Sequence, residues 1–327
     1  NRDAVVLDNN WETGEAIFIA ASNVTVKDLT VTRSFWHPIH VVGGESGPTT
    51  GTLIDNVKVL DPGQQGIKIN TDHGNTADFG IIRNSHIELT EEGRAFVSGC
   101  YTGGIDAHAA TGWHIHNNEI RGFWCPQGLS EHAVHFWRGS RDTRVESNIM
   151  FDNARGVGFG LGPGDLDKDW SYDDSPCDGA APPMGHWGGI IRNNFISATD
   201  SGLLASAFGF DAGIAIEKSC QVDVLHNSVY SSAPPFSSIE WRWPGTTIRL
   251  ANNLVSHNLR PRNEAVAEEI TNITGATAAW FVSESDLHLV SGTAASDQGT
   301  ALEAGAADVD IDGESRSATP DVGADED

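Results

Sequence analysis

Short apolar runs recur along most of the chain, and each is followed by one or two polar residues, most often Asn or Asp, and then by another apolar run. Within a run apolar and polar positions alternate, which is the period of a β-strand with one buried face. Eight copies of this unit are present, at residues 24–31, 53–59, 81–87, 113–120, 144–149, 190–196, 222–229 and 248–254. The pattern therefore predicts pairs of short strands that meet at a polar corner.

A third short strand with the same alternation lies between successive copies of the unit. Its members are Ile39–Val41, Ile67–Ile69, Ile105–Ala107, Val134–Phe136, Val157–Phe159, Ile214–Ile216 and Ile239–Trp241. Their first residues lie 28, 38, 29, 23, 57 and 25 positions apart, so the basic period is 23–29 residues, with insertions in two turns. Strands this short, without crossover helices, bury their inward residues only by stacking turn upon turn, which predicts a solenoid.

This repeat resembles the right-handed parallel β-helix of pectate lyases and of many secreted bacterial carbohydrate-active proteins, over roughly residues 16–290. We therefore expect an all-β, single-stranded right-handed parallel β-helix of about eight to nine turns in residues 1–290. The Asn residues at the corners are expected to stack into a hydrogen-bonded ladder. Residues 291–327 are expected to form an acidic C-terminal tail that packs on the solenoid.

Composition narrows the classes of partner. The 45 acidic and 20 basic residues give a formal net charge of −25, which disfavours binding to nucleic acid or to an anionic membrane surface. No apolar stretch approaches the roughly 20 residues of a membrane-spanning helix. With 36 Gly and only 2 Met, the chain does not read as a helical bundle. We expect a monomer whose partner is a polysaccharide.

The four cysteines fall in loops beside the third strands of successive turns. Equivalent positions in stacked turns lie about 4.8 Å apart, near the separation that a disulfide needs. The predicted pairs are Cys100–Cys125 and Cys177–Cys220. Two disulfides indicate an oxidising compartment, and hence a secreted or cell-surface protein.

In a β-helix the outward residues are free for function, and the third strands carry an unusual outward column. Its middle positions hold His40, Lys68, Asp106 and His135 in four successive turns, and then Gly158 and Ala215. Such a concentration of titratable groups predicts a functional groove around residues 68–141. The residues predicted to be catalytic are Lys68, Asp106, His108, His135 and Arg138. Those predicted to bind substrate are Asn70, Glu131, His132, Trp137, Arg141, Trp241 and Arg242.

The resemblance to β-helix lyases implies β-elimination on a uronate-containing polysaccharide. That reaction needs a base, a proton donor for the leaving oxygen and a group that neutralises the sugar carboxylate. We expect the base to be Lys68, His108 or His135, with Arg138 or Arg141 on the carboxylate. Asp106 would orient a histidine or hold calcium.

Two alternatives from other classes remain open. A glycoside hydrolase would use two carboxyl groups, and Asp106 with Glu131 is the best pair in the sequence. A non-catalytic glycan-binding or surface β-helix could instead hold a transition metal through His108, His132 and His135. Positions i and i+3 of a strand point to opposite faces, which counts against that triad.

Two acidic segments are further candidates for cation binding. The tail carries Asp308, Asp310 and Asp312 in an Asp-x-Asp-x-Asp-Gly run, which resembles half of a calcium-binding loop. The insertion at residues 163–187 is rich in Asp and long enough to form a wall or lid over the groove. Calcium is therefore the expected cofactor, if there is one.

Overall fold

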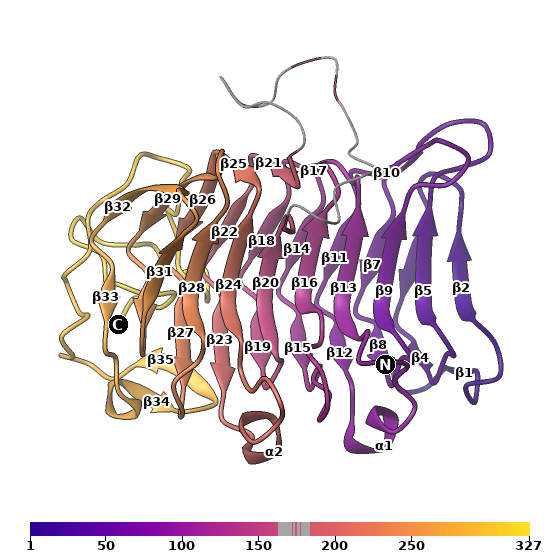
Figure 1. The fold of residues 1–327 in the computed structure, drawn as a ribbon, viewed down its shortest axis with the longest axis horizontal. Helices are drawn as coiled ribbons and strands as arrows, with labels where there is room; N and C mark the ends of the chain where they lie inside the picture. The colour runs from indigo at the N-terminus through magenta and orange to yellow at the C-terminus, as the bar shows by residue number, and fades with distance from the viewer. Residues whose placement is uncertain (163–171, 173, 175–176, 178–183) are drawn as a thin grey trace.

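The computed structural model describes residues 1–162, 172, 174, 177 and 184–327. These residues wind through stacked turns of three parallel strands, which confirms the predicted right-handed parallel β-helix (Figure 1). Two of the three long sheets have nine strands and the third has ten, in agreement with the expected number of turns. The acidic insertion that was predicted to be a lid lies almost entirely outside the described residues. No helix among the described residues is long and apolar enough to span a bilayer.

The third strand of each turn belongs to one long sheet, called here the site sheet. It consists of β2 (Glu15–Ile19), β5 (His37–Val42), β9 (Gln65–Asn70), β13 (Gly103–His108), β16 (His132–Trp137), β20 (Arg155–Phe159), β24 (Ala212–Glu217), β28 (Ser237–Arg242) and β31 (Leu259–Arg262).

The two strands of the polar-corner unit form the other two long sheets. The first strands are β3 (Thr25–Lys27), β7 (Leu53–Asp55), β11 (Ile81–Arg83), β14 (His114–His116), β18 (Arg144–Glu146), β22 (Ile190–Arg192), β26 (Val222–Leu225), β29 (Thr247–Ala251) and β32 (Val266–Ile270). The second strands are β4 (Thr30–Thr32), β8 (Lys58–Leu60), β12 (His86–Glu88), β15 (Glu119–Arg121), β19 (Ile149–Phe151), β23 (Phe195–Ala198), β27 (Ser228–Ser231), β30 (Leu254–Val255) and β33 (Ile273–Thr274), with β1 (Val6–Asp8) at the edge.

The remaining elements are short and lie at the periphery. Strand β6 (Thr49–Thr50) pairs with β10 (Ala77–Asp78), and β17 (Ser140–Arg141), β21 (His186–Trp187) and β25 (Ser219–Cys220) form a small parallel sheet. Two one-turn helices, α1 (Glu91–Arg94) and α2 (Ser201–Leu204), lie on the same side of the solenoid (Figure 1). After the last turn come η1 (Ala278–Trp280) and the antiparallel pair β34 (Phe281–Ser283) and β35 (Asp286–Leu289).

Equivalent apolar residues of successive turns stack inside the solenoid. In the site sheet Ile67, Ile105, Val134 and Val157 are neighbours in register, and each is fully buried. Because every inward position contacts the same position one turn away, the interior is a set of continuous apolar columns. The alternation in the sequence is therefore the direct cause of the core.

The polar corner between the first and second strand of each unit has two parts. The first corner residue has a positive φ, for example 55° at Asn117 and 53° at Asn193, and Asn tolerates this left-handed backbone better than most residues. The second corner residue, such as Asn118 or Asn194, is buried and turns its amide along the solenoid axis. The Asn-Asn dipeptides of the repeat therefore combine a backbone requirement with a side-chain requirement.

The second corner residues form the predicted ladder. Asn148 donates both its backbone N–H and its side-chain Nδ2 to Oδ1 of Asn194, each at 3.0 Å. Asn194 in turn donates Nδ2 to Oδ1 of Asn227 at 2.9 Å and to the carbonyl of Val145 at 3.0 Å. The same pattern runs through Asn118, Asn148, Asn194, Asn227, Asn253 and Asn272. Corner backbone groups that strand pairing leaves free are satisfied in this way.

Both predicted disulfides are confirmed. Cys100 pairs with Cys125 across a Cα–Cα distance of 5.4 Å, and Cys177 pairs with Cys220 across 6.2 Å. Each closes a loop against the neighbouring turn, as stacking requires. No free cysteine is left among the residues that the structure describes.

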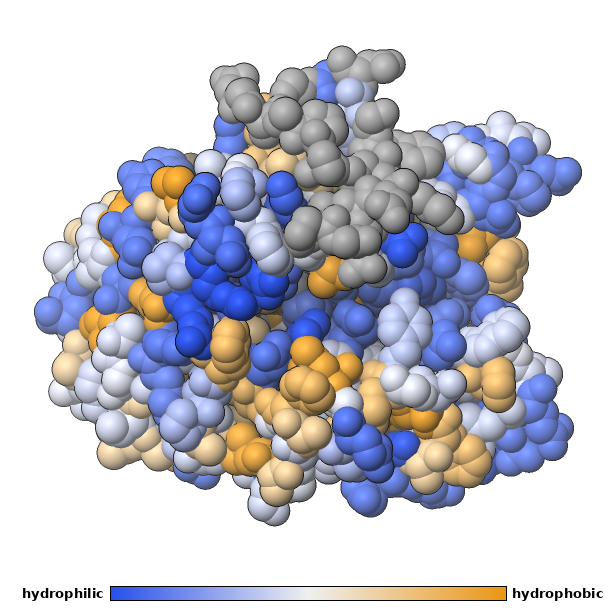
Figure 2. Space-filling view, viewed as in Figure 1, coloured by the Kyte–Doolittle hydropathy of each residue, from blue (hydrophilic) through white to orange (hydrophobic). Residues whose placement is uncertain are grey.

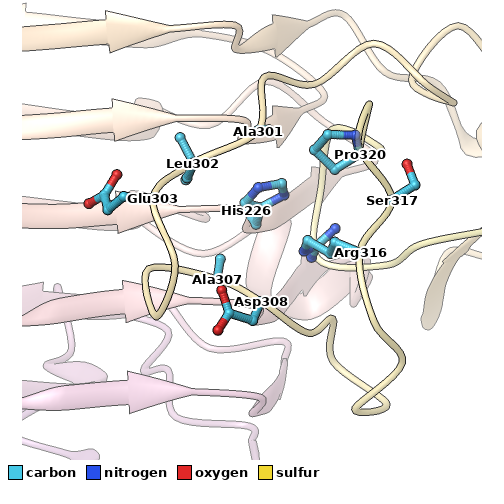
Figure 3. A pocket seen from close by; sticks show the side chains of 9 residues that line it. All are labelled: His226, Ala301, Leu302, Glu303, Ala307, Asp308, Arg316, Ser317 and Pro320. Atoms are coloured by element: carbon cyan, nitrogen blue, oxygen red, sulfur yellow. The ribbon is translucent and has the colours of Figure 1, made fainter.

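The residues after β35 pack along the outer side of the last turns. Arg316 donates to the carbonyls of Gly323 and Ala324 at 3.1 Å each and to Oδ1 of Asn193 at 3.0 Å. A pocket of about 220 Å³ lies between this tail and His226 (Figure 3). Within the predicted calcium run, Asp310 accepts the backbone N–H groups of Asp312, Glu314 and Glu326. That carboxylate is engaged in closing a turn, and calcium at the tail stays a prediction.

A charge cluster on the outer face of β18 makes stability depend on pH. Although burial opposes ionisation, His114, Arg192 and Arg144 lower the pKa of Glu146 to about 2 from its ordinary value of 4.5. A lowered carboxyl pKa contributes stability above pH 4.5 that is lost as the pH falls toward 2. We expect Glu146→Gln to abolish about 2 kcal/mol of the pH-dependent stability in that window.

Urea unfolding at several pH values between 2 and 6 measures this contribution. Glu45→Gln is the control, because Glu45 is exposed in the loop before β6. A Glu146→Gln variant with the same pH dependence as the wild type would contradict the assignment.

Candidate functional site

A bend in the strands of the site sheet places two histidines of β16 on the same outer side. Ala133 and Val134 are consecutive, and both are fully buried in the core, so His132 and His135 both point outward. Earlier turns bend at the same place, where a Cβ added to Gly104 would lie 2.7 Å from the Ile120 side chain in the interior. The prediction that positions i and i+3 face opposite sides is therefore wrong for this pair, because two adjacent residues point inward.

The predicted residues Lys68, Asp106 and His108 form one buried charge cluster. The Lys68 ammonium donates to Oδ2 of Asp106, and both residues are almost fully buried, at 3% and 1% exposure. Nε2 of His108 lies 3.1 Å from Nζ of Lys68 and 3.3 Å from Oδ2 of Asp106. Trp137 donates its indole N–H to Oδ1 of Asp106 at 2.8 Å. One carboxylate thus holds in place a histidine of its own strand and a lysine and a tryptophan of the two neighbouring strands.

Burial and neighbouring charges shift the pKa values of the residues in this cluster in different directions. Burial disfavours an ionised Asp106, but Lys68, His108 and His135 hold its pKa well below the usual range. Burial lowers the pKa of His108, which leaves it a neutral imidazole near pH 7. Tyr101 lies at the edge of the cluster, with its hydroxyl 3.5 Å from Nζ of Lys68, and burial raises its pKa. A neutral imidazole and a protonated phenol therefore both lie next to the same ammonium group.

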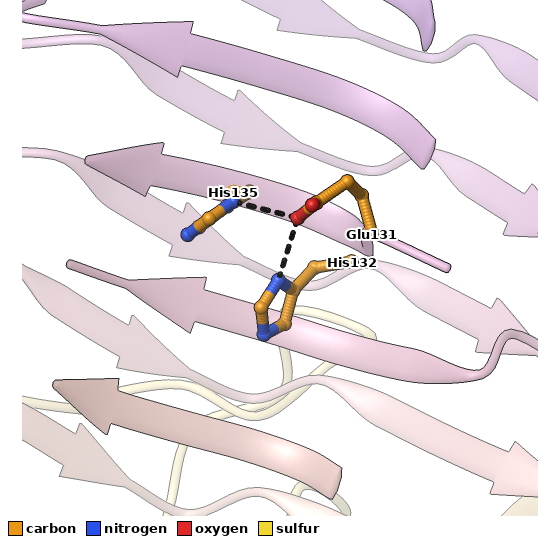
Figure 4. A group of neighbouring side chains, drawn as sticks. All are labelled: Glu131, His132 and His135. Atoms are coloured by element: carbon orange, nitrogen blue, oxygen red, sulfur yellow. Dashed lines mark ion pairs between the residues drawn. The ribbon is translucent and has the colours of Figure 1, made fainter. Parts of the chain in front are cut away.

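A second group, formed by Glu131, His132 and His135, adjoins the charge cluster (Figure 4). Oε2 of Glu131 lies 3.2 Å from Nδ1 of His135 and 3.8 Å from Nδ1 of His132. Nε2 of His135 lies 2.9 Å from the carbonyl oxygen of Gly160. The His132 and His135 rings are 4.4 Å apart between centroids, and both are buried. This group is called here the Glu-His-His group.

A cleft of about 330 Å³ opens beside the Glu-His-His group, and His132 lines it. The small side chain of Ala215, on β24, lines the cleft, whereas the His132 ring occupies the space above Gly158, where a Cβ would lie 2.6 Å from Nε2 of His132. Its charged lining consists of Arg155, Asp211, Glu217, Glu240, Arg242 and Arg262. Figure 2 shows hydrophilic side chains gathered over the middle of the face drawn in Figure 1.

The arginines of this cleft are held by carboxylates on its wall. Arg155 contacts Asp211 at 2.9 Å, and Arg262 contacts Glu240 at 3.1 Å. Arg242 lies 3.6 Å from Glu217 and 3.9 Å from Glu240. Burial, assisted by the neighbouring Glu217, raises the pKa of Glu240.

Two residues that were predicted to bind substrate lie elsewhere. Trp241 is 1% exposed and belongs to the interior core, because alternation along β28 turns it inward after Glu240. Arg141 lies in β17, outside the site sheet, where it contacts Asp142 at 2.7 Å and Asp174 at 2.9 Å. The prediction that Trp241 lines the groove is therefore wrong, and substrate binding by Arg141 stays a prediction.

The other predicted residues surround the charge cluster. The Arg138 guanidinium lies over the Trp137 ring, 4.6 Å from its centroid, so this indole is covered and does not offer a bare face to a sugar. Asn70 lies 3.4 Å from His40 on the preceding turn. Arg242 lines the cleft, as the outward series of the third strands indicated.

The sequence-based selection missed several residues of the site. Tyr101 follows Cys100 in a loop, where no periodic pattern predicts its direction. Glu217 and Glu240 belong to the outward series, but they follow turns with Gly158 and Ala215, and the predicted groove ended before them. The small residue Ala215 was a usable signal, because a small residue in an outward column leaves room for a cleft beside its larger neighbours.

The hydrolase pair proposed from the sequence is not available for a sugar. Asp106 Oδ1 and Glu131 Oε2 both contact Nδ1 of His135, at 3.4 and 3.2 Å, so that imidazole occupies the space between them. The structure also changes the set of residues that could bind a metal, which was predicted to be His108, His132 and His135. Glu131, and not His108, has its ligand atom within 4.8 Å of those of His132 and His135.

Comparison with known proteins identifies the fold. No protein-family model and no curated protein sequence matches the chain. An alginate lyase from Paenibacillus sp. str. FPU-7 aligns over 78% of this chain and 75% of its own, with a TM-score of 0.51 and 14% identity. The chain shares the parallel β-helix fold of that lyase.

Two further solved structures share this arrangement. PfbA, a surface adhesin of Streptococcus pneumoniae, aligns over 83% of this chain and 67% of its own, with a TM-score of 0.52 and 15% identity. XylC, solved in complex with xylose, aligns over 92% of this chain and 59% of its own, with a TM-score of 0.51 and 12% identity. Identities this low concern the fold of this parallel β-helix protein alone.

Proposed function

We propose that the protein is a polysaccharide lyase that cleaves a uronate-containing polysaccharide by β-elimination in the groove of the site sheet. The observation that supports this most is the placement of His108 and Tyr101. Nε2 of His108 and the hydroxyl of Tyr101 lie 3.1 and 3.5 Å from Nζ of Lys68, outside the buried Lys68–Asp106 ion pair. The fold shared with an alginate lyase is consistent with this reaction class.

Each chemical role has a candidate. His108 is the base, because Lys68 is engaged as a donor to Asp106, whereas a neutral imidazole accepts a proton. In this assignment Nε2–H of His108 donates to Oδ2 of Asp106, 3.3 Å away, and Nδ1 takes the proton of the substrate. Tyr101 donates its proton to the leaving oxygen. The C–H electron pair forms the new double bond as the C–O bond breaks, so the step needs no other reactant.

Arginines neutralise the negative charge of the substrate carboxylates. The Arg138 guanidinium, next to His108 and over the Trp137 ring, neutralises the carboxylate of the reacting uronate and so acidifies the adjacent C–H bond. Arg155, Arg242 and Arg262 in the cleft bind carboxylates of neighbouring sugar units. Each of these arginines is paired with a carboxylate of the cleft wall, so binding requires the sugar carboxylates to compete with Asp211, Glu217 and Glu240 for the guanidinium groups.

The test is a spectrophotometric assay on alginate, polygalacturonate and a neutral glucan. A lyase produces an unsaturated uronate, whose double bond absorbs in the ultraviolet, and the acidic substrates alone should give it. We expect His108→Gln and Tyr101→Phe each to lower kcat at least 100-fold. Tyr230→Phe, a buried tyrosine near the tail, is the control and should retain activity. Full activity of both site variants would overturn the roles assigned here.

A glycoside hydrolase is the second candidate, because a carboxyl pair exists in the cleft. Glu217 and Glu240 flank Arg242, and burial raises the pKa of Glu240 toward that of a proton donor. New reducing ends without ultraviolet absorbance, abolished in Glu240→Gln, would favour the hydrolase. Binding without either product would favour a non-catalytic glycan-binding or surface protein, and the structural neighbour PfbA is a surface adhesin.

The setting in which the protein works is also a proposal. Two disulfides within the described residues fit an oxidising compartment, and we infer that the protein acts outside the cytoplasm as a monomer. Nonreducing gel electrophoresis of protein from culture medium and from cytoplasm, together with size-exclusion chromatography, tests both statements.

A further inference from the structure

The Glu-His-His group brings three possible metal ligands together: Oε2 of Glu131, Nδ1 of His132 and Nδ1 of His135. Both ring nitrogens of His132 are buried without a hydrogen-bond partner, whereas Nδ1 of His135 lies near two carboxylates, 3.2 Å from Oε2 of Glu131 and 3.4 Å from Oδ1 of Asp106. His132 is 2% exposed and His135 is fully buried. Leaving buried polar atoms unpaired costs about 1–3 kcal/mol each, so the two ring nitrogens of His132 call for an explanation.

The contact of His135 with Gly160 determines which ring nitrogen of His135 carries the hydrogen. Because the carbonyl of Gly160 only accepts, Nε2 of His135 must carry a hydrogen at a separation of 2.9 Å. In the neutral ring Nδ1 then bears a lone pair, which faces Oε2 of Glu131 at 3.2 Å and Oδ1 of Asp106 at 3.4 Å. Electron-rich atoms at these distances need a positive species between them, either a proton or a metal ion.

A proton accounts for only part of the group. A second hydrogen on His135 would satisfy its contact with Glu131, but it would leave both ring nitrogens of His132 without a partner. A metal ion bound to Glu131, His132 and His135 satisfies one atom of each residue at once. Ligands of a tetrahedral zinc ion, bonded at about 2.0–2.2 Å, lie about 3.3 Å apart. The observed O···N separations of 3.2 and 3.8 Å are close to that value.

We propose that Oε2 of Glu131, Nδ1 of His132 and Nδ1 of His135 bind a divalent transition-metal ion of the zinc class. Two imidazoles and one carboxylate suit zinc, whereas calcium takes six to eight oxygen ligands. The hydrogen bond from Nε2 of His135 to the carbonyl of Gly160 is of the kind that fixes the orientation of a metal-bound imidazole. The sequence-based triad needed His108, and the bend at Ala133 replaces it with Glu131.

The surroundings indicate the kind of site. Three protein ligands leave a fourth position of a tetrahedral ion open, which is typical of metals that bind a water or a substrate. His132 lines the cleft that holds Arg155, Arg242 and Arg262. An anionic group of a ligand in that cleft would meet both the arginines and the metal. The metal site itself rests on ligand geometry alone and does not require lyase activity.

The test measures metal binding without substrate. Protein stripped with a chelator is dialysed against Zn²⁺, its metal content is measured, and Zn²⁺ affinity is determined by competition with a chromogenic chelator. We expect one strongly bound Zn²⁺ per chain. With Co²⁺ in its place, the d–d absorption should be that of a four-coordinate ion. An absence of stoichiometric binding by the wild type would overturn the proposal and leave the group an ion pair.

Variants locate the ion. Glu131→Gln and His132→Gln should each weaken Zn²⁺ binding at least tenfold, whereas His108→Gln should bind Zn²⁺ as the wild type does. His288→Gln is the second control, because His288, Asp312 and Asp325 form the other group of suitable spacing among the described residues. Loss of binding in His288→Gln, with binding retained in His132→Gln, would place the ion at the tail and refute the proposal. Zinc binding without ultraviolet product would refute the lyase alone.

Discussion

Replacing Asp106 with asparagine is expected to lower the free energy of unfolding by about 3–5 kcal/mol, the largest effect that we predict for a single substitution. The reason is that Lys68 would remain buried at 3% exposure without its counter-ion. An amide at position 106 would keep an oxygen for the indole N–H of Trp137 but would present its NH₂ group, or a weaker acceptor, to the ammonium. Urea unfolding followed by circular dichroism measures the loss.

Two further variants test the explanation. Adding Lys68→Met to Asp106→Asn removes the unpaired charge, so the double variant should regain most of the lost stability. Asp211→Asn breaks a more exposed ion pair, that with Arg155, and should cost less than 1 kcal/mol. If Asp106→Asn lowers the free energy of unfolding no more than Asp211→Asn does, the Lys68–Asp106 pair does not stabilise the fold as predicted.

Replacing Asn194 with alanine is expected to cost about 3 kcal/mol, because one side chain serves three neighbouring turns. The variant would remove the acceptor of the Asn148 backbone N–H and the donor to the carbonyl of Val145. Both groups are buried in the corner, where each unsatisfied group costs about 1–3 kcal/mol. Thermal and urea unfolding of the variant measure the effect.

The matched control for the ladder is Asn117→Gly. Asn117 occupies the exposed first position of a corner, with φ of 55°, and glycine adopts that backbone freely. We expect its stability to stay within about 0.5 kcal/mol of the wild type. Equal losses in Asn117→Gly and Asn194→Ala would mean that the ladder itself contributes little.

The fold could be predicted from the sequence because its cause is local and repeated. The alternation at Ile105–Ala107, and again one turn later at Val134–Phe136, determines which side chains are buried, and stacking places equivalent positions next to each other. The same logic gave both disulfides. Cys100 and Cys125 occupy corresponding loops of adjacent turns, so their proximity follows from the repeat.

The site was less predictable because it depends on departures from the repeat. Two consecutive inward residues, Ala133 and Val134, brought His132 onto the same side as His135, against strict alternation. Tyr101 reaches the charge cluster from a loop, whose direction no period describes. Trp241 is a different case, since alternation from Glu240 predicts that it points inward, and its aromatic character led to the wrong placement.

The two disulfides also determine how the solenoid would respond to a pulling force. Each turn contacts only its neighbours, so tension at the two ends would peel turns away one after another. The disulfides close covalent loops with sequence separations of 25 and 43 residues, and the chain inside each loop cannot extend while the bond is intact. The turn that carries the Glu-His-His group lies between these two loops. Reducing agents should therefore lengthen the fully stretched molecule, and a single-molecule extension curve would show the added length.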